Sequence, residues 1–539
     1  MVKRKKKFKY AVLLLIPLLI TYYIASAYFV KEIYYYNSSK SFMEYIVYAT
    51  IFLTTLFVVI FTIRGFKCLK KNKTKSYVGY FFFLILFIAG EIFIGTNINR
   101  ISNSISKLTS KESGYSSSLI TLKSSNINKI SDIKDEKIGM ISDINNIEGY
   151  TLPMEIVKDK NLNKENIASY DSFTEMLTDL YNDEIDAAFI SSSYVSMFSS
   201  EEGLESLGTD TKVIYEKSKK TATKKAISDK TLSEPFTILL MGVDSDAGDL
   251  AKSNSFNGDT LMLITFNPNT MNATVLSIPR DTRVPIVCTK GKGLNKINSS
   301  AYYGADCVMD TITNFTDIKI DYWVKVNFKG TVDLVNALGG IEVDVPYAFC
   351  ESNSTRDFGK KTVYVEKGRQ TLDGEKALAF ARNRHPWPQY CSKKYTNYTS
   401  NDFVRGQNQQ QLVKAITNKL KSVRSLSEIY NILDVVGNNI DTNIDKNTMI
   451  TGFDLFKNII FNSRNIKNDD FIGTQRLYLS GSDHMINGIY YFEYSKKSLK
   501  EITKAMKVNL EIEEPEMDKT FEFSINSPYE DVQIGKGTK

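Results

Sequence analysis

Histidine is almost absent from this sequence of 539 residues, which contains only His385 and His484. Cysteine is scarce as well, and no two of the five cysteines have the spacing of a CxxC motif. Structural zinc sites are built mainly from cysteine and histidine ligands at such spacings. The sequence therefore argues against a zinc-binding protein.

Acidic residues are scarce at the amino-terminal end, where residues 1–100 hold 15 Lys or Arg against only Glu32, Glu44 and Glu91. The remaining chain has 53 basic and 58 acidic residues, so the net charge of +7 originates in the first hundred residues. Proteins that bind nucleic acid need a basic surface to contact phosphates. The mildly acidic remainder of the chain therefore argues against a nucleic-acid partner.

Three long apolar runs explain the basic end, and each is long enough to cross roughly 30 Å of membrane hydrocarbon: Tyr10–Val30, Phe42–Ile63 and Tyr77–Ile98. Lys3–Lys9 and Arg64–Lys75 each carry six Lys or Arg, whereas the loop between the first two runs carries two. The positive-inside rule then places the amino terminus in the cytoplasm and all residues after the third span outside. We expect residues 1–100 to anchor the protein in the lipid of the cell membrane as a multi-pass segment, because no convincing signal-peptide cleavage site follows the first run. Glu91 should lie near the outer interface or face the other helices, with a functional role as the alternative.

The cysteines agree with this topology. Cys68 falls in the cytoplasmic loop, where it should stay reduced, and the other four form an even set outside. Three pairings are possible from the sequence. We favour Cys288–Cys307 and Cys350–Cys391, because each pair flanks a loop-rich segment beside candidate site residues, and the alternative is four free buried thiols.

Residues 101–216 are predicted to form an accessory α/β domain, since short apolar runs alternate with helical patterns. Phe173, Met176, Leu177, Leu180 and Tyr181 recur at helical spacing, and Ala187–Ile190 reads as a buried strand. The segment resembles one lobe of an extracellular solute-binding protein, through INKISDIKDEKIGM, the Gly149–Tyr150 pair and DSFTEMLTDLYNDEIDAAFI. It could bind a ligand or serve as a spacer with its own core. A polar connector around Ser102–Ser118 should precede it.

The rest of the chain is predicted to contain a second α/β domain, preceded by a linker and followed by a tail. Residues 217–232 are rich in lysine and serine and read as a linker, residues 233–510 as the main domain, and residues 511–539 as a tail. We expect one mixed sheet packed by helices on both faces. The expected strands are Phe236–Val243, Leu261–Phe266, Ala273–Ile278, Tyr322–Asn327 and the GGIEVDV segment. The expected helices are Asn295–Tyr303, Val308–Phe315, Gly330–Leu338, Gly374–Arg382, Asp402–Val423 and Thr448–Ile460.

Charged residues gather where the first strands of this domain begin or end. Asp244 follows one apolar run and Asp259 precedes the next, while Arg280 and Arg283 follow a third. Carboxylates can hold a divalent cation, and arginines bind phosphate oxygens with a planar fork of donors. A second group follows in the chain, formed by Arg382 and Arg384 in LAFARNRH and by Asp402 and Arg405 in NDFVRG. The pattern favours an arginine-rich site for pyrophosphate.

Each of these residues also has a purely structural interpretation. The two aspartates would suit turns or caps beside strands. Arg280 and Arg283 could form surface ion pairs with Asp281. Arg382 and Arg384 could be helix carboxy-terminal cations, although their spacing of two fits an unwinding helix end better. Asp402 could be a helix N-cap with Arg405 one turn later.

Seven ordered motifs distinguish between these interpretations: GVDS, GDT, SIPRDTRV, LNKINSSAYYGA, NALGGIEVDV, LDGEKALAFARNR and the segment Asp402–Gln409. Together they resemble the LytR-CpsA-Psr (LCP) family of cell-envelope glycopolymer ligases over about Ser233–Leu510. The resemblance implies metal contact by Asp244 and Asp259, with Mg²⁺ or Mn²⁺ as the cofactor. It also implies catalytic or phosphate-binding roles for Arg280, Arg283, Arg382, Arg384, Asp402 and Arg405.

The resemblance also implies the reaction. A phosphoglycopolymer, such as teichoic acid or capsule, would be transferred from a polyprenyl-pyrophosphate-linked donor to a peptidoglycan acceptor. Lys296, Asn298 and Gln409 are candidates for substrate binding, and Lys296 is favoured over Asn298 because the two would face apart on a helix. Asp402 is the candidate that orients or deprotonates the acceptor hydroxyl. An apolar tunnel for the polyprenyl tail could be lined by Val324, Val326, Phe328, Leu334 and Leu338, with burial in the core as the alternative for each.

Two positions depart from the family pattern. Asp246 and Asn408 stand where many members have arginine, which should weaken the grip on phosphate or indicate a different head group. Two rival functions stay open: a polyprenyl-pyrophosphate hydrolase, and a non-catalytic envelope sensor that works through the accessory domain. A transcription attenuator is rejected, because the inner segments consist of a short basic tail and one short basic loop.

Overall fold

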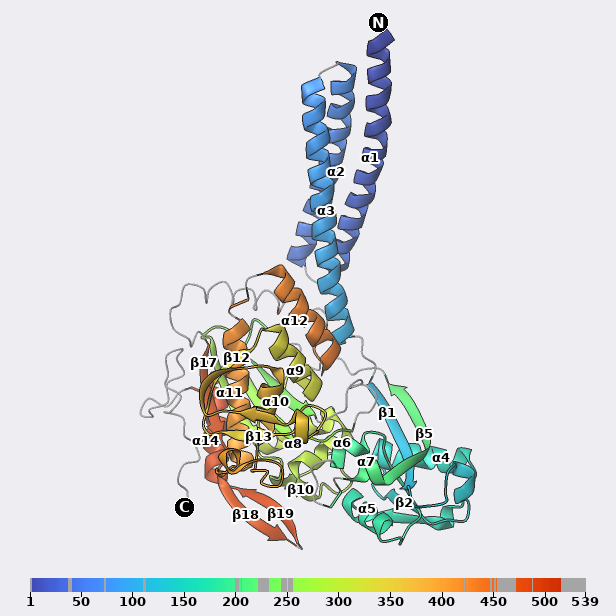
Figure 1. The fold of residues 1–539 in the computed structure, drawn as a ribbon, viewed down its shortest axis with the longest axis vertical. Coiled ribbons are helices and arrows are strands. Elements are labelled where there is room, and N and C mark those ends of the chain that lie inside the picture. Colours follow the sequence, from blue (N-terminus) through green and yellow to red (C-terminus); the bar gives the residue numbers. More distant parts are fainter. Residues whose placement is uncertain are drawn as a thin grey trace. The chain divides into compact units, whose positions relative to one another are not determined.

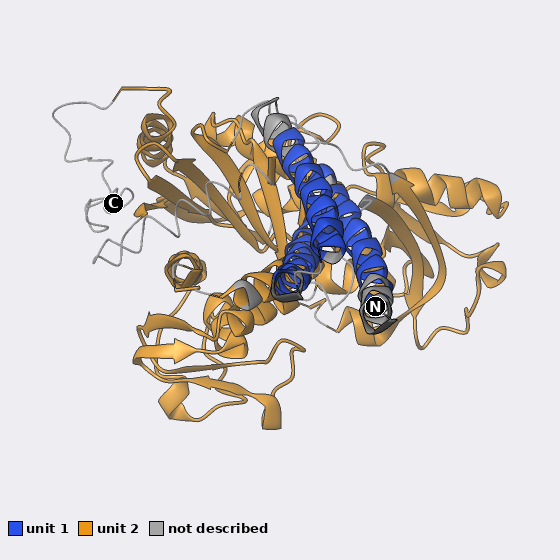
Figure 2. Ribbon diagram, turned by 90° about the horizontal axis from the view of Figure 1, so that it is seen from above, with its two compact units in different colours: residues 1–107 blue, residues 108–539 orange. Residues whose placement is uncertain are grey.

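The computed structural model divides into two compact units, residues 1–107 and residues 108–539 (Figure 2). The structure describes residues 2–36, 41–71, 74–109, 113–198, 203–204, 206–221, 232–243, 250, 255–420, 422–423, 425–445, 448–449, 452, 472–486 and 488–514.

Three long helices make up the first unit: α1 (Val2–Tyr36), α2 (Ser41–Lys70) and α3 (Thr74–Thr109). Each contains a segment long and apolar enough to cross a membrane, so the three predicted apolar segments do form helices of the length that a span requires. Glu91 of α3 is buried, and the hydroxyl of Ser26 in α1 donates to its carboxylate at 2.8 Å. Glu91 therefore faces the other helices, which was one of the two placements expected from the sequence. The expected polar connector is largely regular structure, because α3 continues to Thr109 and a strand begins at Ser113.

The accessory lobe, residues 113–221, contains a five-stranded sheet in the order β3-β2-β4-β1-β5. The neighbouring strands β1 and β5 lie side by side in Figure 1. Its strands are β1 (Ser113–Leu122), β2 (Ile138–Ile141), β3 (Ile167–Tyr170), β4 (Ala187–Ser191) and β5 (Thr211–Thr221). β2 is parallel to both β3 and β4, whereas β1 is antiparallel to β4 and β5. This arrangement confirms the predicted α/β layout.

Helices cover the sheet of the accessory lobe: η2 (Ile147–Thr151) with α4 (Leu152–Asp159), α5 (Phe173–Tyr181), α6 (Tyr194–Phe198) and α7 (Leu207–Asp210). The apolar residues at helical spacing do form α5, whose N-cap is Ser172. β5 extends into the segment expected as a linker. Lys217 in this strand forms ion pairs with Glu155 and Asp159 of α4 at 2.9 and 2.8 Å, so a lysine-rich sequence can be strand here.

The main domain, residues 232–514, is built on a six-stranded mixed sheet in the order β16-β11-β6-β7-β8-β17. The strands are β6 (Phe236–Val243), β7 (Thr260–Asn267), β8 (Asn272–Ile278), β11 (Tyr322–Asn327), β16 (Ile440–Thr442) and β17 (Gly473–Tyr478). The pairs β11–β6 and β8–β17 are parallel, and the other three pairs are antiparallel. The mixed sheet was predicted, but its edge strands β16 and β17 were not.

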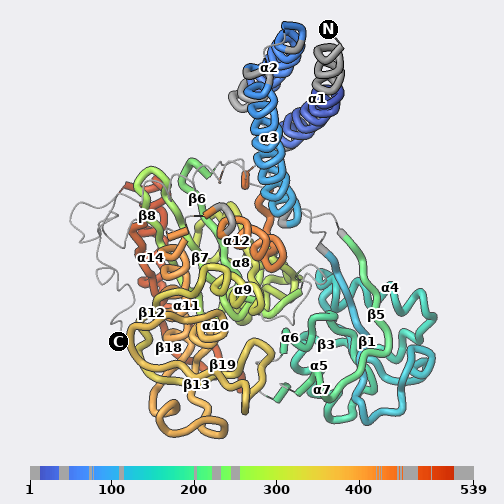
Figure 3. The backbone as a smooth tube through the Cα atoms, turned by 45° about the horizontal axis from the view of Figure 1, so that its top comes forward, coloured from blue at the N-terminus to red at the C-terminus, as the bar shows by residue number. Residues whose placement is uncertain are grey.

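Helices lie on both faces of this sheet, as expected. On one face, α8 (Ala305–Thr316) and α14 (Lys496–Asn509) pack against an apolar core that includes Leu239 and Leu263. On the other face, α9 (Phe328–Ala337), α10 (Gly374–Arg382) and α11 (Asp402–Leu420) lie side by side (Figure 3), and α12 (Leu426–Asn439) packs against α9. Strand alternation turns Leu240 towards this second face, where the candidate site lies.

Smaller ribbons surround the sheet: β9 (Arg283–Pro285) with β10 (Leu294–Lys296), β12 (Ile341–Val345) with β15 (Gly368–Leu372), β13 (Phe349–Glu351) with β14 (Val363–Val365), and β18 (Gly481–Ile486) with β19 (Ile489–Tyr494). Both favoured disulfides, Cys288–Cys307 and Cys350–Cys391, are present, and Cys68 is free.

One predicted helix differs from the structure. The segment expected as a helix over Asn295–Tyr303 forms β10 followed by a 3-10 helix, η4 (Ile297–Tyr303). The hydroxyls of Ser299 and Ser300 donate to carbonyls three residues earlier, and such local bonds compete with the α-helical pattern. Most of the helix expected over Thr448–Ile460 and nearly all of the tail lie outside the described residues.

Candidate functional site

A cavity of about 720 Å³ lies between the sheet of the main domain and the helices α9, α10 and α11. One part of it is apolar. Four of the five residues expected to line an apolar tunnel do line it, namely Val324, Val326, Phe328 and Leu334, and α11 adds Leu412, Val413 and Ile416. Leu338 belongs to the adjoining hydrophobic core instead. The apolar residues come from strand faces and helix stripes that are adjacent only in the folded chain.

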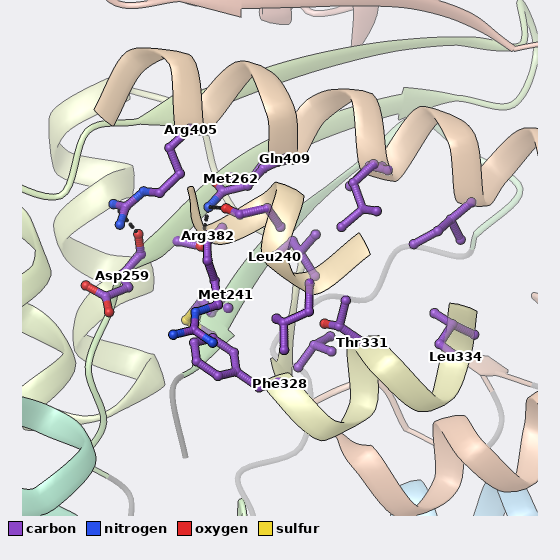
Figure 4. Close-up of a pocket in the computed structure, with 18 of the residues that line it drawn as sticks. Leu240, Met241, Asp259, Met262, Phe328, Thr331, Leu334, Arg382, Arg405 and Gln409 are labelled. Atoms are coloured by element: carbon purple, nitrogen blue, oxygen red, sulfur yellow. Dashed lines mark hydrogen bonds between the residues drawn. The ribbon is translucent and has the colours of Figure 1, made fainter. Parts of the chain in front are cut away.

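The other part of the cavity is charged. Asp259, Arg382, Arg405 and Gln409 lie together at one end in Figure 4, and Leu334 lies at the opposite end. Further polar residues also line the cavity: Arg356, Arg384, Glu351 and His385. The site therefore offers a concentrated positive charge beside a long apolar surface.

Asp259 and Arg280 form the central ion pair of the charged end. Nη1 of Arg280 lies 2.7 Å from Oδ1 of Asp259, and Asn257 donates to Oδ2 of the same carboxylate. Burial by itself would raise the pKa of Asp259, but the charges of Arg280, Arg405 and Arg384 and the hydrogen bond from Arg280 outweigh it and lower the pKa. Asp259 is therefore an ionised carboxylate, although only 13% of its side chain is exposed.

Asp281 extends this pair into a short network. Its carboxylate lies 3.6 Å from Nε of Arg280 and 2.7 Å from Nζ of Lys296. The structure therefore brings Lys296 beside the arginine site, which is the placement favoured over Asn298. Asn298 is buried, and its backbone N–H donates to the carbonyl of Arg280 at 3.2 Å.

The first turn of α11 supplies Asp402 and Arg405. Asn401 caps this helix, because its side chain accepts the N–H groups of Phe403 and Val404. Asp402 is therefore not the cap and its carboxylate accepts a hydrogen bond from Arg405 at 3.0 Å. Arg405 also donates to the backbone carbonyl of Asp259 at 3.1 Å, which holds the guanidinium over the start of β7.

A second, much smaller cavity of about 20 Å³ adjoins this cluster. Asp259, Arg280, Asp402 and Arg405 line it. Asp402 is partly exposed there, and one of its oxygens lies 3.9 Å from Nε of Arg280. A group that enters this cavity would meet two arginines and one accessible carboxylate.

Arg382 and Arg384 lie where α10 unwinds, as their spacing predicted. The helix ends at Arg382, and Asn383 is extended. Arg382 donates to the carbonyl of Asn353 and the hydroxyl of Ser352 at 3.1 and 3.0 Å. Its guanidinium also stacks 4.6 Å from the ring of Phe328, so it is fixed from two sides.

Arg384 differs from its neighbour, because it has no hydrogen-bond or ion-pair partner among the residues that the structure describes. Burial, followed by the nearby charges of Arg280 and Arg405, lowers the pKa of Arg384. A partly buried guanidinium surrounded by like charge gains most from an anionic ligand. Arg384 is therefore the side chain most available to a phosphate oxygen.

Arg283 is not brought to either cavity. Its Nη1 lies 2.9 Å from Glu493 of β19, and its guanidinium lies 5.8 Å from the ring centroid of Tyr491. Arg280 and Arg283 are three residues apart, but β9 begins at Arg283, and this strand contacts β19 of the hairpin β18–β19.

Gln409 lines the cavity and donates to the hydroxyl of Thr260 at 2.8 Å. Asn408 is buried one residue earlier on α11 and donates to the carbonyl of Phe380 in α10. Its amide thus fills a structural position. Position 408 lies at the interface between α10 and α11 and does not line the cavity. Asparagine in place of arginine at this position therefore changes the charge of the helix interface and not that of the cavity lining.

Sequence reasoning missed several polar or aromatic residues of the cavity, among them Arg356, Glu351 and Trp387. Burial, then the charges of Arg382 and Arg384, lowers the pKa of Arg356 to about 10. The indole N–H of Trp387 donates to Glu351 at 3.1 Å. The sequence offered one indication of their role: all three lie between Cys350 and Cys391, in the segment that this disulfide closes.

Asp244 and Asp246 lie outside the described residues, so the predicted metal pair can be examined only at Asp259. Among the described residues, no group of three His, Cys, Asp or Glu side chains could hold a metal ion. Magnesium prefers one or two carboxylates together with water and phosphate oxygens. The ionised carboxylate of Asp259, next to the positively charged cavity, fits that preference.

Comparison with known proteins agrees with the motifs. The LytR_cpsA_psr family model matches residues 195–508, which is more than half of the chain. The chain is 36% identical over 298 residues to the polyisoprenyl-teichoic acid–peptidoglycan teichoic acid transferase TagU of Bacillus subtilis, covering 55% of this chain and 84% of that protein. It is 31% identical to TagT of the same organism, over 51% of this chain and 77% of TagT.

Two further matches complete the comparison. The crystal structure of Bacillus subtilis TagV shares 31% sequence identity, covers 52% of this chain and 99% of TagV, and superposes with a TM-score of 0.41. Residues 103–236 match the model of a periplasmic substrate-binding protein of phosphonate ABC transporters. The accessory lobe is therefore similar to solute-binding proteins in sequence, as its motifs indicated.

Proposed function

Because the chain belongs to the LytR-CpsA-Psr family, we propose that it transfers a phosphate-linked glycopolymer from an undecaprenyl-pyrophosphate carrier onto peptidoglycan. The observation that carries this proposal is the two-ended cavity, which is apolar along α9 and α11 and lined by four arginines at the other end. A polyprenyl pyrophosphate has the same division into a long apolar chain and an anionic head. The glycan is a teichoic acid, a capsular polymer or a related glycan.

The proposed reaction is a phosphoryl transfer. A hydroxyl oxygen of the acceptor forms a bond to the phosphorus that carries the glycan, the bond from that phosphorus to the bridging oxygen breaks, and polyprenyl phosphate leaves with the electron pair. The proton of the hydroxyl passes to a carboxylate. Asp402 is the proposed carboxylate, since it lines the small cavity together with Arg280 and Arg405 and is partly exposed there.

The arginines have two different tasks in this proposal. Arg384 binds the pyrophosphate directly, because its guanidinium is not committed to another described residue. Arg280, Arg382 and Arg405 hold positive charge in fixed positions through their bonds to Asp259, Ser352 and Asp402. Fixed charge of this kind stabilises the negative charge that develops on the leaving group, without reorganisation during the reaction.

Asp259 is the described residue that would hold Mg²⁺ or Mn²⁺, with Asp244 as its expected partner. The metal would neutralise the charge of the pyrophosphate. Asp259 also holds Arg280, so the same carboxylate would position the arginine and contact the metal.

The test uses the purified full chain, a polyprenyl-pyrophosphate-linked glycan, and peptidoglycan. We expect glycan attached to peptidoglycan and release of polyprenyl phosphate, both slowed roughly ten- to hundred-fold in Arg384→Ala and unchanged in the exposed control Arg369→Ala. Release of polyprenyl phosphate at the same rate without acceptor, and with no glycan on peptidoglycan, would identify a hydrolase instead. Loss of activity on addition of a chelator, with recovery on addition of Mg²⁺, would support the metal.

The proposed topology has the amino terminus in the cytoplasm and both α/β domains outside. A membrane-impermeant thiol reagent applied to intact cells should label Ser233→Cys and should not label Cys68, which is free. Labelling of Cys68 in intact cells would reverse the orientation.

A further inference from the structure

The accessory lobe has one edge at which a ligand would be expected. Its strands β2, β3 and β4 are parallel, so their carboxyl ends meet at the same edge of the sheet. In open α/β sheets, ligands bind in the crevice beyond these carboxyl ends. The segments that leave these strands begin with Ser142, Asp171 and Ser192 and lead into η2, α5 and α6.

This edge is occupied by side chains of the main domain. The ring of Tyr302, in η4, lies 5.8 Å from the ring of Phe173 in an edge-to-face arrangement and 5.9 Å from the ring of Phe198. Phe173 is the first residue of α5 and Phe198 the last of α6. Tyr302 packs against the buried cluster of the accessory lobe, so it completes the lobe's core from outside.

Tyr303 adds a polar contact at the same edge. Its hydroxyl donates to Oδ2 of Asp143, which follows β2, at 3.0 Å. Burial and the charge of Asp143 both raise the pKa of Tyr303, so the phenol stays protonated and keeps donating. Two further hydrogen bonds join the domains, from the amide of Asn145 to the carbonyl of Cys288 at 3.1 Å and from the N–H of Lys290 to Asp143 at 3.3 Å.

The bound segment is a closed loop that leads back to the candidate site. The disulfide between Cys288 and Cys307 closes the segment that contains β10 and η4. At the start of η4, the N–H of Asn298 donates to the carbonyl of Arg280, and Lys296 pairs with Asp281. One short 3-10 helix therefore connects the ligand edge of the lobe with the arginine site.

We propose that the accessory lobe takes Tyr302 and Tyr303 of the main domain as its resident ligand and acts as an intramolecular clamp. The clamp holds η4, and through η4 it positions Lys296 and the backbone of Arg280. Lys296 and Arg280 belong to the site of the proposed transferase, so the effect on activity rests on that function. The contact itself does not.

Hydrogen exchange of the full chain tests the contact by changing one side and measuring the other. In the lobe, Asp143→Ala combined with Asn145→Ala removes polar side chains that are at least partly exposed, so the lobe should stay folded. We expect roughly tenfold faster exchange of the amides of residues 297–303, the effect of losing the hydrogen bonds between the domains. Asp135→Ala, on the same lobe, is the matched control and should leave these amides unchanged.

The reciprocal variant combines Tyr302→Ala with Tyr303→Phe in the main domain. It should accelerate exchange in residues 142–151 and 173–177 of the lobe, whereas Tyr364→Ala, at an exposed tyrosine on β14, should not. Unchanged exchange across the interface in both variants would overturn the clamp. If exchange changes as expected but glycan transfer is absent in every form of the protein, the clamp stands and the transferase proposal fails.

A titration distinguishes the clamp from a solute sensor. In calorimetric titrations of the full chain, inorganic phosphate and methylphosphonate should give the same heat with the wild type as with the variant Asp143→Ala combined with Asn145→Ala. Binding of either anion that is abolished by Asp143→Ala combined with Asn145→Ala, and that accelerates exchange of residues 297–303, would overturn the proposal. In that case the edge would be a solute site for which η4 competes.

If the clamp positions the site, the lobe variant should lower the rate of glycan transfer several-fold at saturating donor. The apparent KM for the donor should stay within about twofold, because the residues that line the large cavity are untouched. A lobe variant that shows faster exchange and full transfer rate would overturn the positioning role.

Discussion

Nη1 of Arg280 lies 2.7 Å from Oδ1 of Asp259, and only 10% and 13% of the two side chains are exposed. Both charges have lost most of their hydration, so each depends on nearby opposite charge, and this contact is the shortest ion pair described for Arg280. The pair also joins the residue before β7 to the start of the loop that follows β8. The same contact therefore supports the fold and fixes a positive charge beside the cavity.

Removing one member of this pair should destabilise the main domain. We expect Asp259→Ala to lower the free energy of unfolding by about 3–5 kcal/mol, because only the more distant carboxylates of Asp281 and Asp402, at 3.6 and 3.9 Å, would then compensate the charge of Arg280. The double variant with Arg280→Ala should lose less than the sum of the two single variants. Denaturant unfolding of the four proteins in a double-mutant cycle measures the coupling, and strictly additive losses would contradict it.

The pair should also show in the dependence of stability on pH. The pKa of Asp259 in the folded protein is below its ordinary value, so its ionised form stabilises the fold above the unfolded pKa of about 3.9. This contribution should be lost as the pH falls through the lower folded value. The stability difference between the wild type and Asp259→Asn, measured by denaturant unfolding from pH 7 to pH 3, should therefore be constant at neutral pH and shrink below about pH 4. A difference that grows on acidification would contradict the sign of the shift.

Arg382 and Arg384 should separate binding from folding. Arg384→Ala should lower the transfer rate roughly ten- to hundred-fold, the equivalent of about 1.5–3 kcal/mol, without lowering the melting temperature, since no described partner is lost. Arg382→Ala should lower both, because Ser352 and Asn353 lose their donor and Phe328 its stacked cation. Transfer assays and thermal unfolding of the two variants provide the comparison. Equal melting temperatures and equal rates would show that the two arginines share one role.

Arg283 should behave differently from Arg280, although the two are adjacent in the motif. Its ion pair with Glu493 is about 30% exposed on each side, so Arg283→Ala should cost less than about 1 kcal/mol. We expect a transfer rate within a few-fold of the wild type and faster hydrogen exchange in the hairpin β18–β19. A loss of transfer as large as that of Arg280→Ala would show that Arg283 leaves the hairpin to bind substrate.

Local sequence patterns predicted the parts of the fold that depend on local chemistry. The bounds of β6, Phe236–Val243, agree with the prediction, because a continuous apolar run bounded by polar residues admits little else. The unwinding of α10 at Arg382 followed from the spacing of two arginines. The prediction of an α-helix over Asn295–Tyr303 was wrong. The hydroxyls of Ser299 and Ser300 donate to backbone carbonyls of the same segment and favour the tighter 3-10 helix.

The composition of the site was less accessible to sequence reasoning, because it depends on contacts between distant segments. Arg356 has a backbone φ of 60°, in the left-handed region, and reaches the cavity from a loop with no helical or strand pattern. The separation of Arg280 from Arg283 depends on pairing of β9 with β10 and on contact with β19. A sequence motif identifies which residues are present. Where each side chain lies depends on strand pairing and on contacts between segments that are distant in the sequence.

The apolar part of the cavity should set a limit on the length of the donor's lipid. Thr331 lines it from α9, so Thr331→Trp would fill the space next to Leu334 with an indole ring. We expect a loss of transfer from a donor with a long polyprenyl chain and near-normal transfer from a donor with a short isoprenoid, because the arginine end is untouched. Lys329→Trp, on the exposed side of the same helix, is the matched control. Equal rates with the long and short donors in Thr331→Trp would show that the lipid does not occupy this cavity, even though the arginines beside it bind phosphate.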